Sequence, residues 1–219
     1  MYFRNTPVKL TDSRRHGAGT ELFIVEGDSA ASTVAALRDG QFQAVLPMQG
    51  KPLNAIKASA EKVAAYPLFK ALNESLGIDH SRPTADLFVW DDLRFERLVL
   101  LFDPDADGIH SGALMLMFVY QYLRPLLDQG RVLMIHAPWV QISLTGQQPL
   151  YAYSEAQALA LTQQLRAQGK TPQVVRYRGL SGIDRAILMQ TCIDPATRNA
   201  RVMTEQDALA AIEIFGANV

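Results

Sequence analysis

Three aspartates stand at alternate positions in the stretch DPDADG, where Asp103, Asp105 and Asp107 are followed by Gly108. Carboxylates that lie this close repel one another wherever water is scarce, because the local dielectric no longer screens their charges. A bound cation removes that repulsion. The spacing therefore predicts a divalent metal site.

A calcium-binding EF-hand loop is the first alternative, since it also alternates acids before a glycine. Its twelfth position must supply a bidentate Glu, but counting from Asp103 that position is Leu114, which has no ligand atom. An EF-hand also needs a helix before the loop, whereas Arg97–Phe102 is a short apolar run typical of a buried strand. The calcium-loop interpretation fails on both counts.

A second acid follows a second apolar run, because Glu26 comes directly after the strand-like Glu21–Val25. Ligands of open α/β sheets lie beyond the carboxyl ends of the strands. If the two strands are neighbours, Glu26 shares one sheet edge with the three aspartates. Four carboxylates there could hold one or two divalent ions such as Mg²⁺, which prefers oxygen ligands and assists displacement at phosphorus.

Strand-like and helix-like segments alternate along the rest of the chain in short steps. Strands are expected at 21–25, 42–46, 97–102, 131–136 and 174–177, an extended piece at 139–144, and helices at 30–40, 54–65, 67–76, 112–130, 154–167 and 185–191. This order predicts an α/β fold with a doubly wound, mostly parallel sheet and helices on both faces. The apolar part of the 112–130 helix is far shorter than the ~18 residues of a membrane span.

Composition sets wider limits on location and partners. The chain has 219 residues, 48% of them hydrophobic and 20% charged, and its formal net charge is −1. No general basic field is present, so any nucleic-acid surface must be local. A single cysteine, Cys192, excludes an internal disulfide and fits a reducing compartment. The N-terminal stretch has no apolar signal region. We expect a soluble, cytoplasmic protein.

Several motifs resemble a known family when they are taken together. EGDSA at 26–30 and DPDADG at 103–108 are similar to the TOPRIM domain of topoisomerases and bacterial primases. LPMQGKPLNA at 46–55, RYRGL at 176–180 and DPATRNARVMT at 194–204 resemble the B subunits of DNA gyrase and topoisomerase IV. The resemblance implies a stand-alone or excised C-terminal region of such a protein, with a lead-in segment at 1–20, a TOPRIM core at 21–145 and a small gyrase-B-like α/β extension at 146–219.

The resemblance implies a set of metal ligands. Glu26, Asp103 and Asp105 would bind Mg²⁺, with Asp107 as a further candidate, and Mn²⁺ or Ca²⁺ could substitute for Mg²⁺. The bound ion would activate the scissile phosphate and stabilise charge on the leaving oxygen.

The resemblance also implies basic groups at phosphate and a set of partners. Lys51 and Arg178 match DNA-binding positions, and His110 matches a histidine that could hydrogen-bond phosphate. The catalytic set would be Glu26, Asp103, Asp105, Lys51 and His110. The expected partners are duplex DNA and a gyrase-A-like subunit with the nucleophilic tyrosine. A separate ATPase-domain chain is a further candidate partner, since we expect no ATP site in this chain, and we expect no membrane contact.

Departures from the family pattern leave other functions open. Phe102 replaces the usual Thr, Ile109–Gly112 lacks the usual Arg, and Arg178–Ile183 lacks the usual Glu. These losses fit a divergent paralogue, either a non-catalytic or regulatory DNA-binding protein or a TOPRIM nuclease. A phosphatase built on the D-x-D pattern is disfavoured, because Gly-Thr does not follow.

Simpler interpretations also exist for single residues. The acidic stretch alone is also typical of an Asp- and Gly-rich turn. Lys51 and Arg178 could be solvated surface charges, and His110 a buried structural histidine.

Overall fold

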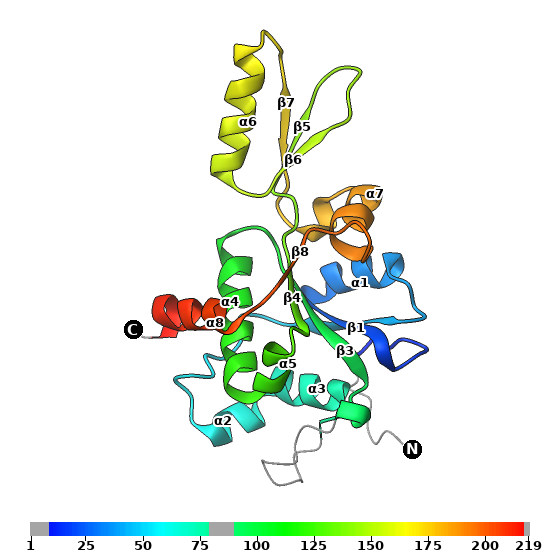
Figure 1. Ribbon diagram of the computed structural model, residues 1–219, viewed down its shortest axis with the longest axis vertical. Coiled ribbons are helices and arrows are strands. Elements are labelled where there is room, and N and C mark those ends of the chain that lie inside the picture. Colours follow the sequence, from blue (N-terminus) through cyan, green and yellow to red (C-terminus); the bar gives the residue numbers. More distant parts are fainter. Residues whose placement is uncertain (1–8, 79–89, 217–219) are drawn as a thin grey trace.

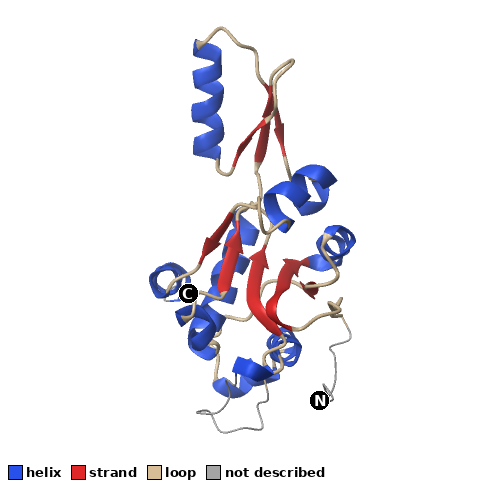
Figure 2. Ribbon diagram, turned by 45° about the vertical axis from the view of Figure 1, so that its right-hand side comes forward, coloured by secondary structure: helices blue, strands red, loops and turns tan. Residues whose placement is uncertain are grey.

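A five-stranded sheet forms the centre of the molecule in the computed structural model, which describes residues 9–78 and 90–216 (Figures 1 and 2). The strand order is β2-β1-β3-β4-β8. β1, β2, β3 and β4 are parallel, and β8 runs antiparallel to β4 at one edge. These strands are β1 (Gly17–Glu26), β2 (Gln43–Met48), β3 (Phe95–Leu101), β4 (Val132–Ile135) and β8 (Ala200–Val202). The expected α/β class with a mostly parallel sheet is confirmed.

The two central strands are apolar on both faces because helices cover both sides of the sheet. In β1, Leu22 and Ile24 contribute to one core cluster, while Phe23 and Val25 contribute to the other. All four side chains are fully buried. This burial explains why the strand appears in the sequence as a continuous apolar run.

One face of the sheet is covered by α1 (Gly27–Leu37), by α7 (Arg185–Leu188) and by the π-helical turn Met189–Ile193. Cys192 lies in this layer and is fully inaccessible, and burial raises the pKa of its thiol to about 11. Cys192 is therefore a core residue.

The opposite face is covered by α3 (Pro67–Leu76), α4 (Ala106–Tyr122) and α5 (Arg124–Asp128). Phe69 of α3 stacks on Phe118 of α4 with ring centroids 3.8 Å apart. α8 (Glu205–Ala211) packs on the outer side of α4 (Figure 1). Within the described residues, no helix has the length and apolarity needed to cross a membrane.

A smaller unit projects from one end of the body (Figures 1 and 2). It comprises β5 (Val140–Ser143), β6 (Leu150–Ala152), α6 (Glu155–Ala167) and β7 (Gln173–Arg176), with the antiparallel order β6-β5-β7. The expected domain division at residue 145 stays a prediction. Strands before and after this position pair with each other in both sheets. β5 pairs with β6 and β7, whereas β8 joins the large sheet.

Four segments differ from the sequence expectations. The helix expected at 54–65 is formed only by α2 (Ala60–Ala65), because the Asn54 side chain closes a turn by accepting backbone N–H groups and Ser59 caps the helix later. The helix expected at 112–130 is formed by α4 and α5, which meet where Pro125 cannot continue the first hydrogen-bond ladder. β6 and β8 were not predicted, since three residues give no readable alternation.

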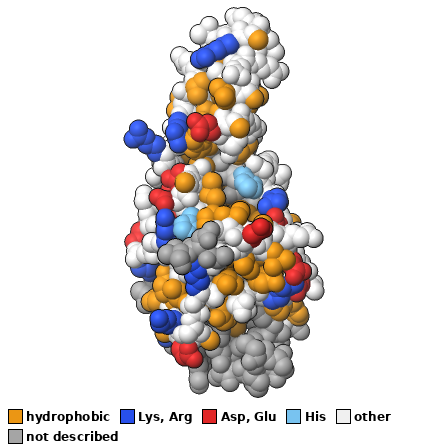
Figure 3. Space-filling model, turned by 90° about the vertical axis from the view of Figure 1, so that its left-hand side faces the viewer, with side chains coloured by type: hydrophobic (Ala, Val, Ile, Leu, Met, Phe, Trp, Pro, Cys, Tyr) orange, Lys and Arg blue, Asp and Glu red, His pale blue; other side chains and the backbone are white. Residues whose placement is uncertain are grey.

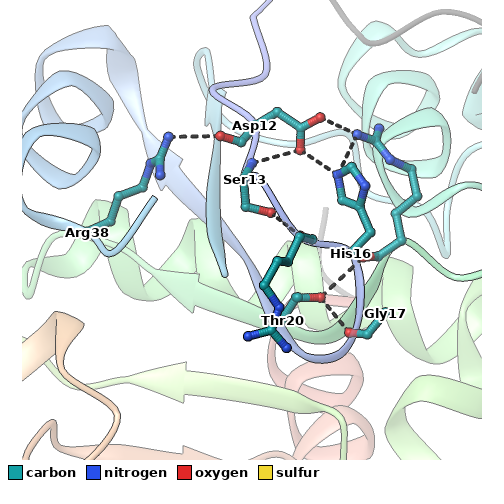
Figure 4. Close-up of polar contacts among 8 residues, drawn as sticks. Asp12, Ser13, His16, Gly17, Thr20 and Arg38 are labelled. Atoms are coloured by element: carbon teal, nitrogen blue, oxygen red, sulfur yellow. Dashed lines mark hydrogen bonds and ion pairs between the residues drawn. The ribbon is translucent and has the colours of Figure 1, made fainter. Parts of the chain in front are cut away.

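The amino ends of β1 and β3 are tied together by a polar network around Asp12 (Figure 4). Its carboxylate pairs with the buried guanidinium of Arg94, just before β3, and lies 3.0 Å from the ring of His16. Its carbonyl accepts from Arg38 at 2.9 Å. The Gly17 N–H donates to the Arg94 carbonyl at 2.8 Å. The network anchors the start of β1 to β3.

Candidate metal and phosphate site

Glu26 and the acidic loop follow adjacent parallel strands at the same edge of the sheet. β1 pairs directly with β3, and Val25 lies opposite Leu101 in the register. Glu26 therefore stands level with Phe102, one residue before Asp103. The expectation that the two acid-terminated strands are neighbours is confirmed.

Glu26 ends β1 and stands at the start of α1, where its side chain makes no capping hydrogen bond. Its pKa is raised, first by burial and then by repulsion from Asp103, Asp105 and Asp107. The nearby hydroxyl of Ser111 opposes that rise. Ser111 is fully buried, and its oxygen has no hydrogen bond of ordinary geometry within the described residues. This corner thus holds mutually repelling carboxylates beside an unsatisfied hydroxyl.

Asp103 is held by a segment that comes from far along the chain. Its Oδ1 accepts the backbone N–H of Leu180 at 2.8 Å, which lowers its pKa, but burial outweighs this bond and the pKa is raised. A Cβ on Gly179 would lie 3.1 Å from Asp103 Oδ2, so a side chain at that position would crowd the carboxylate. This contact brings the RYRGL stretch, and with it the exposed Arg178, to the acidic edge.

Asp105 has a second role as the N-cap of α4. Its Oδ1 accepts the backbone N–H of Gly108 at 2.9 Å, which satisfies one of the free donors of the first turn. A Cβ on Gly108 would meet the carbonyl oxygen of Asp103 at 2.0 Å. Only glycine fits there, so the glycine of the DPDADG stretch is required by the close packing of the loop on itself.

Asp107 points outward and pairs with Lys51, whose Nζ lies 2.7 Å from Asp107 Oδ1. The pair lowers the pKa of Asp107 and raises the pKa of Lys51. Lys51 lies in the loop after β2, so the structure brings this lysine to the acids.

His110 lies in the first turns of α4 and stacks on Phe215. The ring centroids are 4.9 Å apart, and the ring planes are inclined by 18°. The sequence did not single out Phe215, Ser111 or Gly179 as site residues. Nothing local to the stretch that ends at Phe215 indicated a contact with His110.

The donor set fits a hard divalent cation, although its side chains also make other contacts. Among the residues that the structure describes, no three His, Cys, Asp or Glu side chains converge on a common ion position. Asp105 holds a helix N–H and Asp107 holds Lys51. Glu26 and Asp103 are the carboxylates with raised pKa values, and Mg²⁺ needs only one or two protein carboxylates when water and phosphate complete its shell.

A cavity of about 400 Å³ opens beside Asp103, between α4, the end of β4 and α8. Its lining is mostly apolar and includes Ile109 and Ile214, whose side chains are 63% and 62% exposed. Figure 3 shows hydrophobic side chains across the middle of this side of the body. The acidic edge therefore borders an apolar surface.

Comparison with known proteins matches these features to one family. The model of the Toprim domain matches residues 21–136. The B subunit of DNA gyrase from Halalkalibacterium halodurans is 36% identical over 210 residues, covering 95% of this chain and 32% of the relative. The corresponding proteins of Thermotoga maritima and Thermus thermophilus are 37% and 34% identical, again over 95% of this chain. The chain spans about a third of the length of these curated relatives.

Proposed function

This chain belongs to the Toprim domain family, and on that premise we propose that it is the Mg²⁺-binding module of a type IIA DNA topoisomerase. The observation that carries the proposal is the meeting of Glu26 and Asp103 at one sheet edge, with the RYRGL segment closed over Asp103. The similarity to the B subunit of DNA gyrase along 95% of the chain supports the same assignment.

In this proposal Glu26, Asp103 and Asp105 bind the metal, and Asp107 joins them when Lys51 releases it. Mn²⁺ or Ca²⁺ can replace Mg²⁺, since all three ions take oxygen ligands. The bound ion supplies Lewis-acid activation of the scissile phosphate and stabilises the leaving oxygen. The chain itself contributes the half-buried carboxylates of Glu26 and Asp103, whose pKa values are raised and which gain most from a neighbouring positive charge.

The basic groups near this edge contact DNA phosphate. Lys51 exchanges Asp107 for a phosphate oxygen, which needs only a rotation of an exposed side chain. Arg178, exposed and beside the Gly179 contact, approaches the backbone from the opposite segment. His110 offers a ring nitrogen as a hydrogen-bond donor to phosphate.

The remaining parts of the reaction come from partners. Duplex DNA is the substrate, a gyrase-A-like subunit supplies the nucleophilic tyrosine, and a separate ATPase-domain chain drives strand passage. The module works in the cytoplasm in association with the nucleoid.

The metal can be tested by thermal unfolding with and without Mn²⁺ or Mg²⁺. A ligand that binds only the native state stabilises it by RT ln(1 + [L]/Kd), about 2.7 kcal/mol at a hundredfold excess over Kd. The midpoint should rise for the parent chain and for Glu155→Gln, a surface acid of α6. It should stay constant for Glu26→Gln. An equal rise in all three proteins would contradict the proposed ligands.

A non-catalytic, regulatory DNA-binding Toprim protein is the second candidate. It is favoured by the Lys51–Asp107 ion pair and by the absence of three converging metal ligands within the described residues. DNA binding that is independent of Mn²⁺, together with an unchanged midpoint, would select this candidate. A metal-dependent nuclease activity that Glu26→Gln abolishes would select a Toprim nuclease instead.

A further inference from the structure

One face of the His110 imidazole is covered by an aromatic ring from the end of the described chain. The ring belongs to Phe215 in the π-helical turn Ile212–Gly216, which follows α8. A stacked partner restrains the plane of an imidazole but leaves its edge free, and both ring nitrogens lie on that edge. The stack therefore fixes orientation without occupying either hydrogen-bonding atom of His110.

The same turn is tied to the loop that carries Lys51. The side-chain amide of Asn54 donates to the Phe215 carbonyl at 3.2 Å. The amide oxygen of Asn54 accepts two backbone N–H groups of the turn that follows it, at 3.1 and 3.2 Å. Asn54 stands shortly after Lys51, whose own carbonyl accepts the Tyr66 hydroxyl at 3.2 Å. One residue thus links the loop of Lys51 to the stacking partner of His110.

The π-helical turn packs against α4 and α8. Ile212 and Phe215 pack against Leu114, Met117 and Ala211, of which Met117 is fully buried. Because these contacts hold Phe215 in place, its ring can restrain the side chain of His110 on the neighbouring turn of α4.

We propose that Phe215 is a positioning residue that orients the imidazole of His110 toward phosphate, and that Asn54 extends this restraint to the Lys51 loop. The inference rests on the proposed function, because that function assigns His110 and Lys51 to phosphate. It adds that the turn after α8, outside the acidic motifs, sets the geometry of both groups.

The orientation can be measured by NMR on histidine-labelled protein. The chain has four histidines, and His110→Gln identifies the resonances of His110. Stacking should shift the His110 ring protons upfield. Phe215→Leu should abolish that shift, Phe215→Tyr should preserve it, and Leu209→Ala on the exposed side of α8 should leave it unchanged. Unmoved His110 resonances in a folded Phe215→Leu protein would overturn the proposal.

The consequence for binding can be measured as a double-mutant cycle. Affinity for a short DNA duplex in Mg²⁺ is compared among the parent, His110→Gln, Phe215→Leu and the double variant. If Phe215 acts through His110, each single change weakens binding by a similar factor and the double variant is no weaker than His110→Gln. If the affinity losses of the two single variants multiply in the double variant, the positioning role is overturned. A His110→Gln protein with the affinity of the parent overturns it as well. If the parent chain showed no rise in melting temperature with Mn²⁺, that result would contradict the metal-binding function but not the positioning role of Phe215.

Discussion

At the scale of single residues, the packing around Asp103 depends on two glycines that have no side chain. Gly108 lies so close to the Asp103 backbone that a Cβ has no room there, and a Cβ on Gly179 would crowd the Asp103 carboxylate at 3.1 Å. The Leu180 N–H can reach Oδ1 of Asp103 because Gly179, the residue before it, has no side chain. Gly108 and Gly179 therefore leave space for the backbone and the half-buried carboxylate of Asp103.

The variant Gly179→Ala tests this packing. Its Cβ would lie 3.1 and 3.4 Å from the two carboxylate oxygens of Asp103, so the Leu180 hydrogen bond must lengthen. We expect a loss of ~1–3 kcal/mol in the free energy of unfolding, as for other overpacked sites, measured by urea denaturation. Gly182→Ala is the matched control, because nothing lies within 4 Å of its Cβ. Equal stabilities of the two variants would refute the crowding.

At the scale of elements, the start of α4 combines a helix cap with a proposed metal ligand in one residue. Asp105 holds the Gly108 N–H, and its charge also adds to the repulsion that raises the pKa of Glu26. The loop between β3 and α4 is thus folded by the same carboxylates that the proposed function uses.

Two substitutions at Asp105 separate these roles. Asp105→Asn keeps an oxygen that can cap the helix, whereas Asp105→Ala loses the cap at a cost of ~1 kcal/mol. Both should lose the Mn²⁺-dependent rise in melting temperature, but only the alanine variant should melt lower without metal. A metal response that survives in Asp105→Asn would remove this residue from the ligand set.

A buried ion pair fastens the segment before β8 to β1. Arg198 donates to both oxygens of Glu21, at 2.7 and 2.6 Å, and both side chains are almost fully buried. Gln43 adds a bond of 3.0 Å to the same carboxylate. The ion pair therefore links the edge strand β8 to the centre of the sheet, in addition to the backbone hydrogen bonds between β8 and β4.

Removing one partner of this pair should cost more than removing both charges. Arg198→Met leaves the buried Glu21 carboxylate with only the Gln43 amide and the more distant Arg97 guanidinium, at 3.9 Å, as partners. We expect ~3–5 kcal/mol of destabilisation in chemical denaturation. Adding Glu21→Gln to that variant should recover part of the loss, because no buried charge then remains. A further loss in the double variant would contradict this account.

At the scale of the whole molecule, the chain is one body with a projecting unit and almost no net charge (Figure 1). Under the proposed function, affinity for DNA comes from a few local cations, and another protein chain supplies the covalent step. We expect the purified chain with Mg²⁺ to leave supercoiled plasmid supercoiled. Nicking that disappears in Glu26→Gln would contradict this expectation in favour of a nuclease.

The local origin of DNA affinity predicts a shallow dependence on salt. Each neutralised phosphate contributes about −0.9 to the slope of log K against log salt. Lys51→Glu should remove about one such unit, as measured by fluorescence anisotropy with a labelled duplex. Lys170→Glu, in the exposed turn after α6, reverses the same charge in the projecting unit and should leave the slope unchanged.

The α/β class, the central strands and the acids that end them could all be predicted from the sequence. These features are local: a strand buried on both faces is a continuous apolar run, and its last residue marks the sheet edge. The adjacency of β1 and β3 could be anticipated because both runs end in acids and parallel strands share an edge.

The way in which the site is held together became visible only in the folded chain. The bond from Leu180 to Asp103 spans 77 residues, and the contacts of Lys51 with Asp107 and of Phe215 with His110 also join distant segments. The three-residue strands β6 and β8 likewise exist only through their partners. Such pairings depend on the packing of whole elements, so no short stretch of sequence carries a signal for them.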